Sequence, residues 1–210
     1  MIIRNELTSD YREVEELTRK AFWNLYVPGC IEHYLVHIMR NHKDFLPALD
    51  LVIECDGTII ANIMYTKAKL VDEEGNEKPI LTFGPLSVLP AYQRKGYGKK
   101  LLEYSFQKAV ALGYDAVVIL GSPENYISSG FKSSKRYNIC ASDKSFPAAL
   151  LVKELCEGAI PKGNWTFQES PVYEFDTQAA EAFDQTFEKL EKEYQTSQEL
   201  FYIHSHSQVF

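Results

Sequence analysis

Two glycines and four basic residues near the middle of the chain have the composition of an anion-binding loop. Glycine lets a backbone approach a ligand closely, and the free N–H groups in the first turn of a helix point at an anion placed there. The glycines are Gly96 and Gly98, and the basic residues around them are Arg94, Lys95, Lys99 and Lys100. The chain as a whole carries a formal charge of −7. Positive charge this local favours a bound polyanion over a role in solubility alone.

Two common phosphate-binding motifs do not fit this loop. A P-loop needs glycine five residues before Gly98, where this chain has Gln93. A dinucleotide fingerprint that starts at Gly96 needs glycine at the position of Leu101. The pattern that remains is Gln93-x-x-Gly96-x-Gly98. It lies between a strand-like run that ends at Val88 and an amphipathic helical pattern over residues 98–112.

A second segment with a distinctive spacing follows that helix. Residues 116–120 form a continuous apolar run, which suits a strand buried on both faces. The run is followed by a Gly-x-Pro sequence that starts at Gly121, and then by Tyr126, which stands four residues before Gly130-Phe131. These spacings predict a strand, a short helix and a turn.

The two segments together resemble the GCN5-related N-acetyltransferase (GNAT) superfamily, and a bacterial subgroup of predicted acetyltransferases in particular. Gln93-x-x-Gly96-x-Gly98 is similar to the family's acetyl-CoA pyrophosphate loop, Q/R-x-x-G-x-G/A. The second segment is similar to the family's later motif, although Ile119 stands where an asparagine is usual. The resemblance covers residues 1–135 and implies an acetyl-CoA-dependent transfer of an acetyl group directly to a primary amine.

The resemblance also implies a set of site residues. The backbone of the strand end would bind the pantetheine arm of acetyl-CoA, and the N–H groups of the loop would bind its pyrophosphate. The expected cofactor-binding residues are Leu86, Ser87, Val88, Gln93, Arg94, Lys95, Gly96, Tyr97, Gly98 and Lys99. Tyr126 would be the general acid that protonates the departing CoA thiolate, with Tyr137 as the alternative donor. The competing interpretations are a plain helix-entry turn for the loop and a packed core tyrosine for Tyr126.

Acetyl transfer also needs a base, because a free amine has a pKa near 10.4 and is protonated at neutral pH. Glu54, Glu32 and Asp50 are the candidates, although carboxylates are more often surface groups. We name Glu54 with Tyr126 as the expected catalytic residues. Cys55 and Cys140 have no visible histidine partner and are expected to be inert thiols.

The elements that must position these residues can be read from periodicity and turn residues. Helical spacing predicts helices over residues 10–25, 31–38 and 98–112. Strands are expected over residues 2–7, 51–55, 59–65, 79–88 and 116–120. The expected fold class is α+β (α/β). The resemblance implies a mixed, mostly antiparallel central sheet, splayed at a V-shaped cofactor cleft and flanked by helices.

The last third of the chain carries weaker signals. We expect residues 1–135 to form the acetyl-CoA-binding and catalytic core, and residues 136–210 to complete or extend it. Strands are predicted over residues 148–155 and 165–175, and a charged final helix over residues 179–194. Trp165, Phe167 and Tyr173 either close over the acceptor site or pack in the core.

Composition excludes several other classes of protein. The sequence is 45% hydrophobic and 24% charged, as in an ordinary globular protein. Its net negative charge argues against binding to nucleic acid. No run approaches the ~20 apolar residues that span a bilayer, and no signal peptide is visible. His33 and His37 lie four residues apart, but no third ligand accompanies them, so a solvated helix face is expected and no metal. We expect a cytoplasmic monomer or homodimer that binds a small-molecule or peptide amine and no membrane.

Two other functions compete with an enzyme. One is a catalytically silent acyl-CoA-binding sensor on the same fold, which would keep the phosphate loop but have no use for Tyr126. The other is a structural protein in which the loop merely begins a helix. Turnover of acetyl-CoA with amines would distinguish an enzyme from the silent sensor. Binding of CoA would exclude the structural protein.

Overall fold

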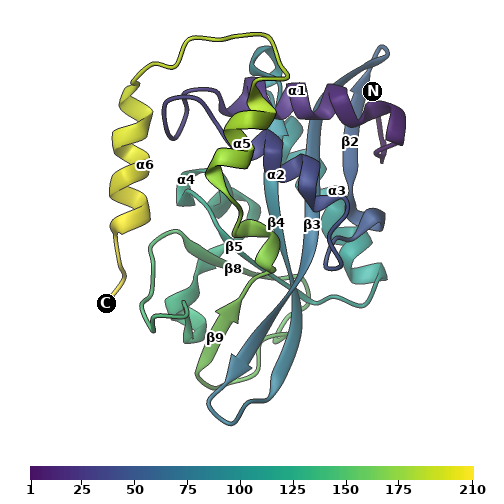
Figure 1. The fold of residues 1–210 in the computed structure, drawn as a ribbon. Coiled ribbons are helices and arrows are strands. Elements are labelled where there is room, and N and C mark those ends of the chain that lie inside the picture. The colour runs from purple at the N-terminus through teal and green to yellow at the C-terminus, as the bar shows by residue number, and fades with distance from the viewer.

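The computed structural model describes all residues, 1–210. The strands are β1 (Ile2–Asn5), β2 (Leu51–Cys55), β3 (Thr58–Asp72), β4 (Glu77–Val88), β5 (Ala116–Leu120), β6 (Lys132–Ser133), β7 (Ile139–Cys140), β8 (Leu150–Glu154) and β9 (Trp165–Gln168). The α-helices are α1 (Tyr11–Phe22), α2 (Glu32–Met39), α3 (Tyr97–Ala111), α4 (Pro123–Tyr126), α5 (Thr177–Asp184) and α6 (Thr196–His206). Figure 1 shows how these elements surround one sheet.

The sheet is mixed and mostly antiparallel, in the order β1-β2-β3-β4-β5-β8-β6, which confirms the predicted fold class. The tip at Asp56-Gly57 joins β2 to β3 as a tight hairpin, with Cys55 paired to Thr58. Both tip residues have positive φ angles, which the Asp-Gly pair tolerates well. The strands β8 and β9 of the last third extend the sheet, since β8 pairs with β5 and β9 pairs with β3.

Two strand pairs of the sheet are parallel, β7–β9 and β4–β5, and the second of them opens the sheet. The strands β4 and β5 pair only at Leu81 and Val117, and beyond that point they diverge (Figure 1). On its other edge, β4 stays paired with β3 as far as Val88. The end of β4 therefore has one free edge, which faces the gap.

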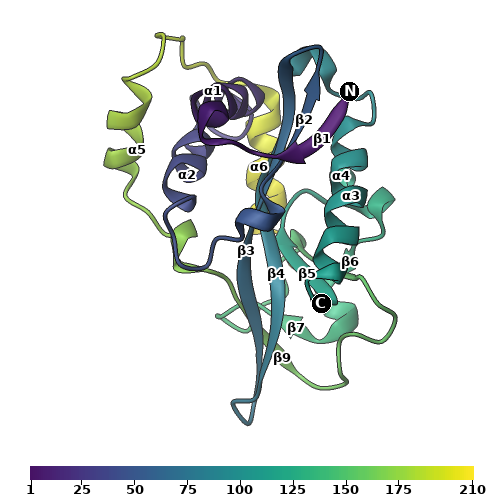
Figure 2. The same cartoon turned by 90° about the vertical axis from the view of Figure 1, so that its right-hand side faces the viewer.

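Helices cover the two faces of the sheet. Figure 2 shows α1, α2 and α5 on one face and α3 on the other. The strand period of two divides the core accordingly, because neighbouring residues face opposite sides. In β2, Leu51 and Ile53 pack in the cluster under α3, whereas Val52 packs in the cluster under α1 and α2.

The C-terminal segments differ from their prediction. The helix expected over residues 179–194 is correct only in its first part, because α5 ends at Asp184 and a new helix, α6, begins at Thr196. Between them the backbone bonds to the turn after α1: the Glu191 carbonyl accepts from the Trp23 indole at 2.9 Å and from the Asn24 amide at 3.1 Å. These tertiary hydrogen bonds outweigh the helical pattern of the sequence. The strand predicted over residues 165–175 also ends early, at Gln168.

Only one of the two histidines on α2 lies on a solvated face, as had been expected for both. His37 is exposed, but His33 is fully buried, with Nε2 3.1 Å from Asp184 Oδ1 of α5 and its ring edge-on to Phe187. The chain holds no group of three or more histidine, cysteine, aspartate or glutamate residues placed to bind a metal ion. None of the helices is both long and apolar enough to cross a membrane.

Candidate active site

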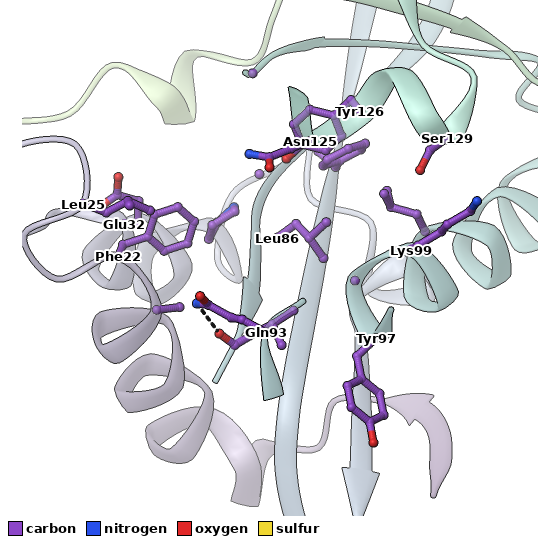
Figure 3. A pocket seen from close by; sticks show the side chains of 18 of the residues that line it. Phe22, Leu25, Glu32, Leu86, Gln93, Tyr97, Lys99, Asn125, Tyr126 and Ser129 are labelled. Atoms are coloured by element: carbon purple, nitrogen blue, oxygen red, sulfur yellow. Dashed lines mark hydrogen bonds between the residues drawn. The ribbon is translucent and has the colours of Figure 1, made fainter. Parts of the chain in front are cut away.

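A cleft of about 690 Å³ lies in the gap between β4 and β5. Its walls come from the end of α1, the start of α2, the second half of β4, the loop into α3, the segment from β5 to α4, and the turn after β9. Figure 3 shows side chains from these distant segments pointing into the same space. The two ends of the cleft differ in how they are built.

The phosphate end is the loop from Gln93 to Lys99 and the first turn of α3. The backbone N–H groups of residues 94–99 donate to no group of the protein, so six donors are available around one turn. Gly96 precedes the helix with a φ angle of 85°, a left-handed conformation that favours glycine. Arg94 has a φ angle of 60°, which is unusual for a residue with a side chain and is a form of backbone strain found at functional sites. The geometry is that of an anion cradle made by the backbone.

Gly98 has no side chain to fill the cleft where α3 meets β4. A Cβ atom there would lie 3.6 Å from the Val88 side chain and 3.9 Å from that of Leu86, which is ordinary contact. A methyl group would therefore fit, but a longer side chain would extend into the space above the end of β4. The Gln93 amide donates to the Val88 carbonyl at 3.0 Å and holds the loop against the same strand end (Figure 3).

The free edge of β4 presents backbone groups to the cleft. Leu89 N–H donates to Ile60 of β3 at 2.9 Å, and pairing in an antiparallel ladder alternates along the strand. The backbone groups of Leu86 and Val88 therefore point away from β3, toward the gap, where the Val88 carbonyl also accepts from the Gln93 amide. An extended ligand with amide groups can hydrogen bond there as an added strand would.

Tyr126 lies at the opposite wall, on α4, and its spacing to Gly130-Phe131 has a packing explanation. Gly130 closes the turn with a φ angle of 89°, and Phe131 then returns beneath Tyr126, edge-on with ring centroids 5.6 Å apart. Gly121 is required on the other side, because a Cβ there would lie 2.6 Å from the tyrosine ring. Burial raises the pKa of Tyr126, and no side chain binds its hydroxyl. The phenol thus remains protonated at neutral pH and is free to donate to a ligand.

The other end of the cleft is aromatic and acidic. Phe22 and Tyr26, at the end of α1 and just beyond it, form one side, and Tyr173 forms another. Glu32 at the start of α2 points into the space beside Phe22 (Figure 3). Burial raises the pKa of its carboxyl group, although its backbone hydrogen bond from Ile31 N–H, at 3.0 Å, acts in the opposite direction.

A second carboxylate reaches the cleft from the turn after β9. Glu169 lines the cavity with an exposed side chain, and partial desolvation together with the charge of Glu174 raises its pKa. Its neighbour on the cleft wall, Tyr173, receives a hydrogen bond from the Thr66 hydroxyl at 3.3 Å. Of the three aromatic residues singled out in the last third of the sequence, Tyr173 lines the cleft, whereas Trp165 and Phe167 are buried in the core.

Most of the residues predicted for the cofactor do line the cleft. They are Leu86, Val88, Gln93, Arg94, Gly96, Tyr97, Gly98 and Lys99, together with Tyr126 on the opposite wall. Ser87 and Lys95 are exceptions. The Ser87 hydroxyl points to the other face of the sheet and donates to Thr18 of α1 at 3.0 Å, and the Lys95 ammonium donates to the Ala91 carbonyl at 2.8 Å.

Glu54, the predicted catalytic base, is not brought to the cleft. It lies on β2 opposite Ile2 of β1, and its carboxylate accepts from Arg4 at 2.8 Å. Asp50 is also elsewhere: it is buried at the start of β2, beside Glu6 and Asn62, and burial with the Glu6 contact raises its pKa to about 9. Of the three carboxylates considered, only Glu32 lines the cleft.

Local sequence patterns did not predict correctly which of three further residues line the cleft: Tyr26, Glu169 and the alternative acid Tyr137. Tyr137 packs beside the core cluster around β8 and β9, where Glu154 contributes to raising its pKa, and it does not line the cleft. Tyr26 and Glu169 do line it, but neither belongs to a motif. A sequence signal for Glu169 would need the pairing of β9 with β3, and one for Tyr26 would need its contact with Phe201 of α6; both join residues nearly a hundred positions apart or more.

Comparison with known proteins gives one consistent result. The Acetyltransferase (GNAT) family matches residues 14–131, which is more than half of the chain. Two curated relatives are uncharacterised N-acetyltransferases of Escherichia coli. YjhQ is 28% identical over 70% of this chain and 74% of its own length, and YhbS is 27% identical over 76% and 90%.

Solved structures agree with this assignment. The chain is similar to Escherichia coli YhbS in complex with CoA, with a TM-score of 0.71 and 23% identity over 83% of this chain and 92% of that one. It is also similar to a Brucella melitensis GNAT family acetyltransferase in complex with acetyl-CoA, with a TM-score of 0.62 and 25% identity over 82% and 97%. With the splayed sheet, the anion cradle and the free edge of β4 already in place, the chain belongs to the GNAT family of acetyltransferases.

Proposed function

We propose that this chain transfers the acetyl group of acetyl-CoA directly to a primary amine, with Glu32 as general base and Tyr126 as general acid. The observation that carries the proposal is the cleft itself. It joins a backbone anion cradle, a free strand edge, a protonated phenol and a desolvated carboxylate in one continuous space.

The cofactor fits the first half of this space. The N–H groups of residues 94–99 suit the pyrophosphate, and the side chains of Arg94 and Lys99 add positive charge beside them. The amide groups of the pantetheine arm can pair with the backbone of Leu86 and Val88. That placement directs the thioester past the end of β4 toward Tyr126.

The chemical step then has a place for each proton. The acceptor enters as an ammonium ion, and Glu32 removes one proton so that the nitrogen can attack the thioester carbonyl. A C–N bond forms and the C–S bond breaks. The nitrogen loses its second proton, which replaces the proton that Tyr126 gives to the leaving group, and Glu32 releases the first proton to solvent. CoA leaves as a thiolate, whose conjugate acid has a pKa near 8.5, and the phenol of Tyr126 donates a hydrogen bond or proton to it. The products are an acetamide, CoA thiol and one released proton.

The direct test is thiol release from acetyl-CoA with a panel of acceptors. Calorimetry with CoA establishes whether the cofactor binds, and butylamine and butanol then serve as matched acceptors that differ only in the attacking atom. We expect CoA to bind, butylamine to be acetylated and butanol to be inert. CoA binding without turnover of any amine would instead indicate a silent acyl-CoA-binding protein.

A further inference from the structure

The positive and negative side chains that line the cleft lie at opposite ends of it. They are four in number, Arg94 and Lys99 at the phosphate end and Glu32 and Glu169 at the aromatic end. No basic side chain lines the aromatic end, so no cationic side chain is available there to pair with a carboxylate or phosphate group of an acceptor. The field inside the cleft instead favours a cation at that end.

Both carboxylates at the aromatic end lack a cationic partner within the protein. No lysine or arginine approaches either of them closely enough to contribute to its pKa shift. By contrast, two carboxylates outside the cleft are paired: Glu6 and Glu15 both contact Arg40 at 2.7 Å. Glu32 is half-buried and Glu169 is exposed on the wall of the cleft. Two carboxylates that face one cavity with no cationic side chain beside them make the potential there negative, which favours a ligand that supplies positive charge.

The walls around these carboxylates suit an organic cation. Phe22, Tyr26 and Tyr173 present ring surface to the cavity, and aromatic rings attract ammonium groups as well as aliphatic chain. Tyr26 is held in place from behind, since it stacks on Phe201 of α6 with ring centroids 4.5 Å apart. The same cleft must also hold the acetyl-pantetheine arm, so the room left for the acceptor is small.

The proposed reaction uses one carboxylate and leaves the other without a role. Glu32 serves the amine that is acetylated, and that amine loses its charge in the reaction. Glu169 lies on a different segment, beside Tyr173, and can bind a group that keeps its charge. We propose that the acceptor is a short aliphatic diamine, whose second ammonium group is bound by Glu169 within the aromatic walls. This inference rests on the proposed acetyl transfer and names its substrate class.

The test compares three acceptors of equal chain length: putrescine, butylamine and γ-aminobutyrate. Each presents the same primary amine, and they differ at the far end, which is cationic, neutral or anionic. A charge-assisted contact to Glu169 should raise kcat/KM for putrescine above that for butylamine by about tenfold to a hundredfold. γ-Aminobutyrate should be the poorest of the three.

A matched pair of variants assigns the preference to one residue. Glu169→Gln should reduce the ratio of putrescine to butylamine to within about threefold, since an amide makes a neutral hydrogen bond only. Glu157→Gln removes an acidic group that is exposed, does not line the cleft and does not contribute to the pKa of Glu169, and should leave the ratio unchanged. A ratio near one in the unmodified protein, or equal effects of the two variants, would overturn the inference.

Failure of the inference is distinguishable from failure of the proposed function. Turnover of butylamine and putrescine at equal rates leaves acetyl transfer intact and removes the diamine. If none of the three acceptors reacts, calorimetry of putrescine into the CoA-saturated protein decides, and absence of binding overturns the inference. Loss of CoA binding itself would overturn the proposed function.

Discussion

The two ends of the cleft are built from different parts of the chain and by different chemistry. At the phosphate end, consecutive residues 93–99 present backbone groups to the ligand. At the acceptor end, single side chains converge from α1, α2, α4 and the turn after β9. A site made of backbone groups requires a particular backbone conformation, and the spacing of glycines in the sequence indicates that conformation. A site made of side chains requires only that distant segments meet in the fold, and no local sequence pattern indicates that.

The largest effect is expected from blocking the backbone cradle. Gly98→Glu would place a long, negatively charged side chain above the end of β4, where the pyrophosphate approaches. We predict at least a hundredfold loss of acetyl-CoA affinity, about 3 kcal/mol, measured by calorimetry. Gly98→Ala is the control, because its methyl group makes ordinary contacts and should change affinity little. Equal affinity in Gly98→Glu and the unmodified protein would refute the assignment of the cradle.

The next effect concerns the acid at the boundary between the two ends. Tyr126→Phe keeps the ring that packs on Phe131 and removes only the hydroxyl, so cofactor affinity should persist. The chemical step should slow about a hundredfold if proton donation to the thiolate limits it. Single-turnover kinetics with saturating acetyl-CoA and butylamine measures that step. A step as fast as in the unmodified protein would mean that the thiolate departs unaided.

A smaller effect separates the two candidates for the base. Glu32→Gln removes the carboxylate at the acceptor end and should lower kcat with butylamine by about tenfold to a hundredfold. Glu54→Gln removes the carboxylate that the sequence favoured, which binds Arg4 outside the cleft, and should leave kcat unchanged. The reverse result would restore Glu54 as the base and refute the acceptor end described above.

The same contrast explains what could be predicted from sequence. The fold class and the position of the cofactor loop follow from motifs whose glycines have local reasons, namely the φ angle of Gly96 and the turn closed by Gly130. The base could not be chosen in this way. Glu54 and Glu32 are both single carboxylates on predicted elements, and only the pairing of β1 with β2 shows that Arg4 already binds Glu54.

The last third of the chain was harder for the same physical reason. Its helical pattern over residues 179–194 is realised only as far as Asp184, where α5 ends, and hydrogen bonds from Trp23 and Asn24 to the Glu191 carbonyl hold the backbone beyond it in a non-helical path. Glu169 takes its place in the cleft because β9 pairs with the far part of β3. Such contacts depend on the assembled sheet, and a local pattern carries no information about them.

The smallest expected effect is on stability, and it concerns the carboxyl group of Glu32 at the acceptor end. Burial raises the pKa of Glu32, so the folded protein binds this proton more tightly than the unfolded chain does. The stabilising contribution is complete below the ordinary glutamate pKa, and it is lost as the pH rises through the raised value in the folded state. Glu32→Gln removes this dependence. The variant should therefore gain stability relative to the unmodified protein as pH increases, by about 1.4 kcal/mol for each unit by which the pKa is raised.

Urea unfolding of both proteins between pH 5 and pH 8 measures this difference directly. Taking the difference cancels the contributions that both proteins share, including that of Asp50, whose raised pKa acts in the same direction. Saturating putrescine should reduce the difference, because a bound ammonium group would favour the charged form of the carboxyl group. A stability difference that does not change with pH would show that Glu32 is well solvated in the folded protein. The acceptor end would then lack the unpaired buried charge that distinguishes it from the phosphate end.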